Sequence, residues 1–150
     1  MPLEIRPAKI VRAATLVHST PDLIYAALTT AAGLNAWFTQ GAQVDARPGG
    51  FIRFQWVDWG PDRVNAEDGG PVLVAEPGRR FVFQWHPDLP DYATTVEIEL
   101  IPEDNGTIIR LSEHGFQDTT SGRAALMNCA VGWGEALTLL KFYCEHGLHY

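Results

Sequence analysis

The chain has 150 residues, 46% of them hydrophobic and 19% charged, and this length suits one domain with a self-sufficient core. No stretch approaches the roughly 20 apolar residues that span a bilayer, and the N-terminus carries no signal-peptide pattern, so we expect a cytoplasmic protein. A net charge of −7 with dispersed basic residues disfavours nucleic acid and anionic membranes as partners.

The first third of the chain predicts one strand followed by two short helices. Residues 10–18 are rich in β-branched and apolar residues, which favour a strand. Thr20 and Pro21 then supply a cap and a first helical position. Apolar positions continue in a helical spacing through residues 22–38, and we expect this segment to be broken near Ala32-Gly33.

The middle of the chain predicts strands that are joined by turns. The expected strands are residues 42–45, 51–59, 71–75, 80–85, 94–101 and 107–113. Residues 61–70 are charged, contain Pro and Gly and have few apolar side chains, so they predict a loop. Alternation of Val96, Ile98 and Leu100 with glutamates indicates antiparallel strands with one buried face.

The end of the chain predicts one long amphipathic helix. Apolar residues recur every three or four positions from about Gly122 to His146, and Gly147 provides the stop. Cys129 and Cys144 both fall in this helix, about 22 Å apart at 1.5 Å per residue, so they cannot pair with each other. We therefore expect two free, at least partly buried thiols.

Several short motifs, in this order, resemble the START-like (SRPBCC) superfamily, and within it the family named for the activator of the heat-shock-protein-90 ATPase. The motifs are Pro21-Asp22-Leu23-Ile24-Tyr25-Ala26-Ala27-Leu28, Trp37-Phe38, Arg47-Pro48-Gly49-Gly50, Glu76-Pro77, Arg80-Phe81-Val82-Phe83-Gln84-Trp85, Gly106-Thr107, Leu111, Gly115-Phe116, Gly132-Trp133, Leu137 and Leu140.

The resemblance covers nearly the whole chain and implies an α+β helix-grip fold over residues 1–150. In this fold a curved antiparallel sheet of about six or seven strands wraps around a long C-terminal helix, and two short helices follow the first strand. Members of the superfamily include lipid and sterol carriers, polyketide cyclases and hormone receptors. Because one fold hosts many activities, the resemblance alone does not assign a function.

Seven aromatic residues are the candidate ligand-binding residues. They are expected to face the space between sheet and helix or, for Phe116, its mouth: Trp37, Phe54, Trp56, Phe83, Trp85, Phe116 and Trp133. Aromatic rings dominate ordinary protein cores, so one interpretation is that they only fill space. The other is that some of them line a cavity for a small apolar ligand.

Glu113 is the candidate catalytic residue. Counting in twos from Ile109 and Leu111 directs it towards the interior, where an apolar cavity would raise its pKa into the range useful for acid–base work. Alternatively, the strand end twists and Glu113 reaches water or an arginine such as Arg53 or Arg110.

Other chemistry finds little support in the sequence. His86, His114 and Asp58 could form a polar mouth to the cavity, although a histidine at a strand end is more often a surface residue. His146 and His149 lack further ligands at fixed spacing, so no metal site is predicted, and no motif implies a cofactor.

Three functions therefore compete. The favoured one is binding of a small hydrophobic or aromatic molecule. The first alternative is a cofactor-free cyclase-like or dehydratase-like enzyme that uses Glu113, and the second is a cochaperone-like protein-interaction module. The sequence is equally compatible with a monomer and with a weak homodimer.

Overall fold

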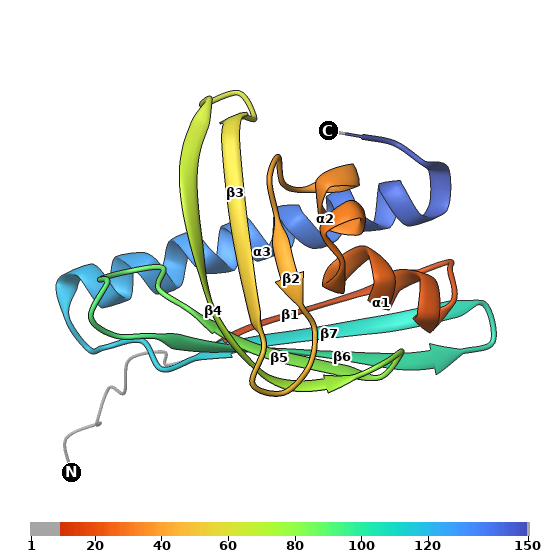
Figure 1. Cartoon of the computed structure of the whole chain (residues 1–150), viewed down its shortest axis with the longest axis horizontal. Coiled ribbons are helices and arrows are strands. Elements are labelled where there is room, and N and C mark those ends of the chain that lie inside the picture. The colour runs from red at the N-terminus through yellow and green to blue at the C-terminus, as the bar shows by residue number, and fades with distance from the viewer. Residues whose placement is uncertain (1–9, 150) are drawn as a thin grey trace, which may run out of the picture.

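Seven antiparallel strands and three helices make up the part of the chain that the computed structural model describes, residues 10–149 (Figure 1). In chain order the elements are β1 (Ile10–Val17), α1 (Pro21–Thr29), α2 (Ala31–Trp37), β2 (Gln43–Asp45), β3 (Phe51–Trp59), β4 (Val64–Glu76), β5 (Arg80–Trp85), β6 (Thr94–Glu103), β7 (Gly106–His114) and α3 (Thr120–His146). The strands follow the order β1-β7-β6-β5-β4-β3-β2 across the sheet. This arrangement confirms the predicted helix-grip fold.

A threonine side chain caps the N-terminus of each helix. The Thr20 hydroxyl accepts a hydrogen bond from the Leu23 backbone N–H at 3.3 Å, and Pro21 occupies the first turn of α1. Thr30 follows the end of α1 and caps α2 by accepting from the Gly33 N–H at 2.9 Å. The break between the two helices therefore falls at Thr30, slightly before the predicted position.

The long helix α3 extends alongside the sheet and its two ends are defined by local interactions (Figure 1). Thr119 caps the first turn by accepting from the Gly122 N–H at 3.0 Å. At the other end Gly147 adopts a left-handed conformation with φ 68° and donates its N–H to the Tyr143 carbonyl. Cys129 and Cys144 both lie in α3 and are free thiols, as predicted.

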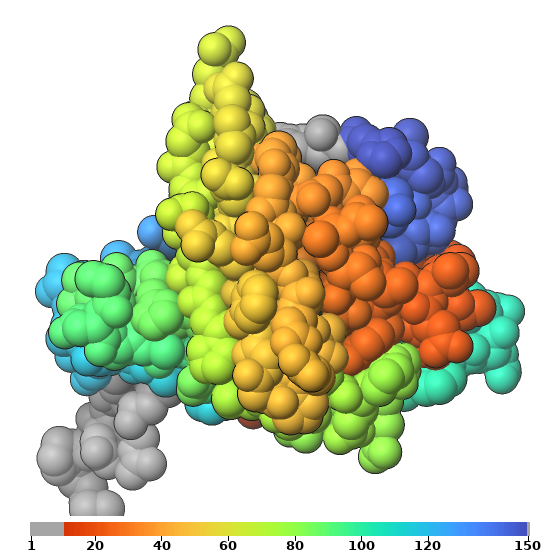
Figure 2. Space-filling view, viewed as in Figure 1, coloured from red at the N-terminus to blue at the C-terminus, as the bar shows by residue number. Residues whose placement is uncertain are grey.

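The prediction of a loop over residues 61–70 is wrong. Strand β4 already begins at Val64, and its first half pairs with β3 from Trp59↔Val64 to Phe51↔Pro71. The outer part of this hairpin, which includes the pairs Trp56↔Ala66 and Trp59↔Val64 and the turn between them, projects from the body of the molecule as a two-stranded arm (Figures 1 and 2). Residues 64–67 of the arm are exposed, so polar side chains are tolerated there, and the polar sequence resembles that of a loop.

Two glycines allow β4 to pass between its two partners. A Cβ atom at Gly69 would lie 2.3 Å from the Ile52 carbonyl oxygen of β3. One at Gly70 would lie 2.2 Å from the Gln84 carbonyl oxygen of β5. Only residues without a side chain permit these backbone approaches, and the same glycines made the segment look like a loop.

The core lies between the concave face of the sheet and the three helices. Its fully buried side chains come from every layer and include Ile24, Leu34, Ile52, Phe81, Phe83, Val96, Ile109 and Leu140. Inward positions alternate along the strands as predicted, and β7 shows Ile109, Leu111 and Glu113 buried in succession.

The substitution Gly70→Ala tests the close approach of β4 to β5. We expect it to lower the free energy of unfolding by about 1–3 kcal/mol, because the new methyl group overlaps a carbonyl oxygen of a neighbouring strand. Urea unfolding measures the change. Gly134→Ala in α3, where a Cβ meets nothing within 4 Å, is the control and should be neutral or stabilising. Equal stability of Gly70→Ala and wild type would contradict the described register.

Candidate functional site

Three tryptophans from three separate elements converge on one side of the core. Trp56 extends the inward alternation of β3, Trp85 ends the inward series of β5, and Trp133 lies on the buried face of α3. The ring centroids of Trp56 and Trp85 are 6.5 Å apart, and those of Trp85 and Trp133 are 5.3 Å apart. The rings therefore form a continuous aromatic wall from the arm to the helix.

Glu113 holds two of these rings in place. Its side chain is 0% exposed, and its carboxylate accepts the Trp85 indole N–H on Oε2 and the Trp133 indole N–H on Oε1, both at 2.7 Å. The Thr94 hydroxyl donates to Oε2 at 2.5 Å. One carboxylate thus ties β5, β6 and α3 to β7, and it fixes the orientation of both indoles.

The inward position expected for Glu113 is therefore what the structure shows. Neither of the two arginines considered as alternative partners pairs with Glu113 in the described part of the chain. Arg53 pairs instead with Glu67 across the β3–β4 hairpin at 2.6 Å. Arg110 is exposed and lies with Glu97 and Glu99 along a charged groove on the opposite face of the sheet.

The thiol of Cys129 lies beside this carboxylate, one helical turn before Trp133. Burial raises the pKa of the Cys129 thiol well above its ordinary value, and the charge of Glu113 and a hydrogen bond to Glu113 raise it further. The thiolate is the nucleophilic form of cysteine, so this environment keeps Cys129 in its unreactive form.

A cavity of about 270 Å³ lies against the aromatic wall, between the arm and α3. Its lining residues are Phe38, Trp56, Trp59, Val64, Ala66, Trp85, Pro87, Ala125, Asn128, Cys129, Gly132, Trp133 and Glu135. The inner part is apolar and largely aromatic. The exposed residues Asn128, Gly132 and Glu135 form its rim on α3.

The seven predicted aromatic residues divide into two groups. Trp56, Trp85 and Trp133 line the cavity, whereas Trp37, Phe54 and Phe83 are buried in the core behind it. Phe116, which was expected at the mouth, does not line the cavity either; it is half-buried and packs against the core. Phe54 supports the wall directly, because its ring stacks on Trp56 with the centroids 5.6 Å apart.

Sequence reasoning missed several lining residues. Phe38 was noted only as part of the Trp37-Phe38 pair, yet its ring packs edge-to-face on Trp56 and Trp59. Trp59 ends the predicted strand 51–59 but was not named as a site residue, and Val64 and Ala66 lie in the half of the arm where a loop was predicted. The helical spacing of Ala125, Cys129, Gly132 and Trp133 could have indicated a shared face of α3.

The residues expected at a polar mouth lie elsewhere. Asp58 is exposed on the arm, in a left-handed conformation with φ 50°, and His114 is exposed at the end of β7. The His86 ring nitrogen Nδ1 lies 3.3 Å from Asp68 Oδ1, and neither residue lines the cavity. Across residues 10–149, no group of three or more His, Cys, Asp or Glu side chains is placed to hold a metal ion.

Comparisons with known proteins place the chain in a family. The family model described as "Activator of Hsp90 ATPase homolog 1-like protein" matches residues 18–145. The chain belongs to this family. A comparison with curated proteins finds no match. None of the described helices is long and apolar enough to cross a membrane.

Solved structures share the fold of this family member at low sequence identity. The Aha1 dimer from Colwellia psychrerythraea is 23% identical, with a TM-score of 0.76 over 93% of this chain and 98% of that one. CalU16 from Micromonospora echinospora is 26% identical, with a TM-score of 0.66 over 89% and 71% of the two chains. DynU16, from the dynemicin biosynthetic locus, is 19% identical, with a TM-score of 0.78 over 94% of this chain and 49% of that one.

The substitution Glu113→Gln tests the role of the carboxylate in the site. An amide keeps one acceptor oxygen and turns an NH₂ group towards indole or hydroxyl donors, so we expect a loss of about 2 kcal/mol in the free energy of unfolding. Urea unfolding followed by tryptophan fluorescence measures it. Glu103→Gln, at the exposed β6–β7 turn, removes the same charge and should change stability by less than about 0.5 kcal/mol. Equal effects of the two substitutions would contradict the described contacts.

The pH dependence of thiol modification tests the environment of the cysteines. Burial and the charge of Glu145 raise the pKa of Cys144 to about 11, and the pKa of Cys129 is raised further. A raised pKa means less thiolate at a given pH, so the native protein should react slowly with iodoacetamide. Its rate should still be rising at about pH 10, whereas the thiols of the denatured chain level off above their ordinary pKa of about 8.5. Reaction rates of the native protein that level off at about pH 9 would contradict the raised pKa values of the two thiols.

Proposed function

We propose that this family member binds a small, apolar, ring-bearing molecule in the cavity between the β3–β4 arm and α3. The observation that carries the proposal is the wall of three tryptophans, two of them oriented by one buried carboxylate. A cavity of about 150 Å³ holds benzene, so the 270 Å³ here suits a molecule of about two rings. Concave, mostly apolar sites with few polar groups are typical of small-molecule binding.

Trp56 carries an unpaired polar group within the aromatic wall. Its indole Nε1 is buried and has no hydrogen-bond partner among residues 10–149. An unsatisfied buried donor costs about 1–3 kcal/mol, so native proteins rarely keep one without a reason.

The glycine at position 132 is evidence for a ligand that lies against α3. Glycine inside a helix costs about 1 kcal/mol relative to alanine. A Cβ atom at Gly132 would meet nothing within 4 Å, so no packing inside the chain requires glycine there. Gly132 lines the cavity, and the missing side chain leaves the helix backbone accessible to a flat ligand.

The contacts of Glu113 favour binding over catalysis. Both of its oxygens already accept hydrogen bonds from protein donors, and Glu113 is not among the residues that line the cavity. Acting as an acid or base on a ligand would require it to release Trp85, Trp133 or Thr94. The cyclase-like alternative therefore needs a rearrangement that binding does not need.

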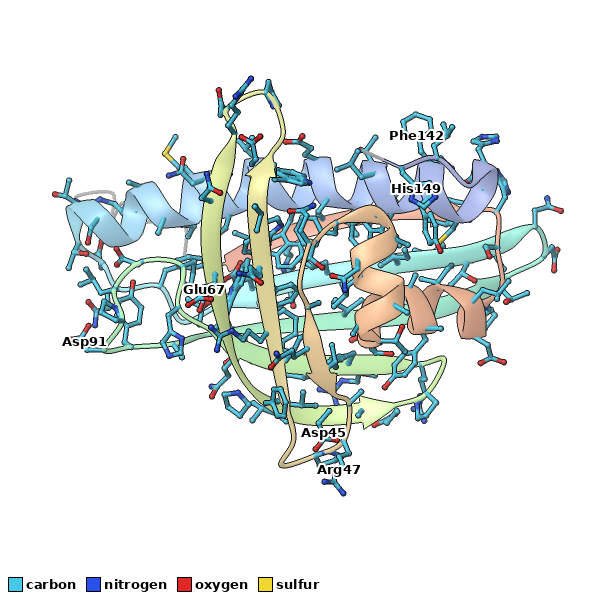
Figure 3. All side chains as sticks on the ribbon, turned by 45° about the horizontal axis from the view of Figure 1, so that its top comes forward. Asp45, Arg47, Glu67, Asp91, Phe142 and His149 are labelled. Atoms are coloured by element: carbon cyan, nitrogen blue, oxygen red, sulfur yellow. The ribbon has the colours of Figure 1, made fainter. Side chains whose placement is uncertain are left out.

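Self-association is a second candidate function, and one helix face favours it. Met127, Val131 and Phe142 lie on one face of α3 and are 68%, 74% and 46% exposed. Figure 3 shows Phe142 on the side of α3 that is turned away from the sheet. One structural neighbour, the Colwellia protein, is a dimer. The interaction role suggested by the family name would use the same kind of exposed apolar surface.

Ligand titration of the purified protein tests binding. Naphthalene-sized ketones and phenols should quench tryptophan fluorescence in a saturable way, because Trp56, Trp85 and Trp133 line the cavity. Gly132→Ala should raise stability by up to about 1 kcal/mol while weakening binding severalfold. Gly134→Ala, two residues away and outside the cavity lining, should raise stability without affecting affinity.

Two outcomes would overturn the proposal. One is the absence of saturable quenching by any compound, together with no small molecule released on denaturation and detected by mass spectrometry. The other is equal weakening by Gly132→Ala and Gly134→Ala, which would place the bound compound elsewhere. Light scattering of the same samples then shows whether self-association is the property of this chain.

A further inference from the structure

We infer that the cavity prefers a cationic ligand, meaning an apolar molecule that carries a quaternary or protonated amine, over a neutral or anionic one of the same shape. The inference rests on the proposed function, because it concerns the same cavity. Three observations carry it: the charges at the rim, the aromatic content of the wall and the contacts behind the wall.

The rim of the cavity carries negative charge only. Glu135 is the single ionisable side chain other than the Cys129 thiol among the residues that line it, and neither Lys nor Arg is among them. Glu135 is exposed, has no ion pair in the described part of the chain, and lies two residues from Trp133 on α3. An anionic ligand would meet an unfavourable potential here, and the net charge of −7 adds to it.

The wall presents five aromatic rings to the ligand, those of Phe38, Trp56, Trp59, Trp85 and Trp133. The faces of aromatic rings attract cations because of the ring quadrupole, and indole does so most strongly. Clusters of such rings are a general solution for binding quaternary ammonium groups. Neighbouring rings lie between 5.3 and 6.5 Å apart, so they form one continuous aromatic surface along the cavity.

Glu113 strengthens this preference from behind the wall. The indoles of Trp85 and Trp133 each donate their N–H to this carboxylate at 2.7 Å. Hydrogen bonds to a charged acceptor polarise the donor, so electron density shifts from the N–H towards the ring. The rings of Trp85 and Trp133 therefore become richer in electrons, although Glu113 itself does not line the cavity.

The nearby basic side chains do not reverse this charge pattern. Arg53 is paired with Glu67 at 2.6 Å, and Arg123, two residues before Ala125 on α3, is paired with Asp118 at 2.7 Å. Arg63 lies near the tip of the arm, 79% exposed and 4.0 Å from Asp58. None of the three lines the cavity.

Calorimetric titration with three probes of similar size tests the inference: phenyltrimethylammonium, its neutral carbon isostere tert-butylbenzene, and the anion 4-phenylbutyrate. We expect the cation to bind about fivefold more tightly than the isostere, and the anion to bind most weakly. Glu135→Gln should weaken binding of the cation about threefold and leave the isostere unchanged. Glu103→Gln, which removes the same charge at the β6–β7 turn, is the matched control and should change neither.

The outcomes separate this inference from the proposed function. Equal or tighter binding of tert-butylbenzene or 4-phenylbutyrate would keep the binding site and overturn the preference for cations. Equal weakening of the cation by Glu135→Gln and Glu103→Gln would also overturn it, because only the overall charge would then matter. Failure of all three probes, with no quenching by the neutral ketones and phenols, would remove the binding site and the charge preference together.

Discussion

The buried carboxylate of Glu113 is the interaction on which the site depends. A charged group placed in a protein interior is costly unless donors compensate it, and here two indoles and one hydroxyl do so. Those donors come from β5, β6 and α3, so the carboxylate can be satisfied only when the helix lies in the correct position over the sheet. The same requirement orients the indoles. The polar cluster therefore specifies the grip of the sheet on the helix and the shape of the aromatic wall together.

Packing alone would not set the position of α3 so narrowly. Its buried face consists largely of Ala, Leu and Trp side chains, which can contact the sheet in several neighbouring registers. A displacement of α3 along its axis would separate Trp133 from Glu113 and leave a buried acceptor without a donor. Hydrogen bonding thus supplies the specificity, while burial of Leu137, Leu140 and the strand residues supplies most of the stability.

The order of strands and helices and the inward position of Glu113 could be predicted from local periodicity, whereas the wrapping of the sheet around the helix was implied by the family resemblance. Alternation along residues 109–113 and the helical spacing beyond residue 120 need no knowledge of distant contacts. The hydrogen bonds of Glu113 could not be predicted, because they depend on the registers of three strands and on the position of a helix. The β4 half of the arm was missed for another reason: residues 64–67 are exposed, and their mostly polar sequence gives little apolar alternation to reveal a strand.

The arm also separates residues that shape the cavity from residues that hold the sheet and the helix together. Trp56, Trp59, Val64 and Ala66 line the cavity from a hairpin whose outer half pairs with no further strand, whereas the remaining wall belongs to the core. Residues at the tip of the hairpin, between Trp59 and Val64, can be exchanged, added or removed without disturbing the packing between β5, β6, β7 and α3. Related chains can therefore change the shape of the cavity at the arm while keeping the same scaffold.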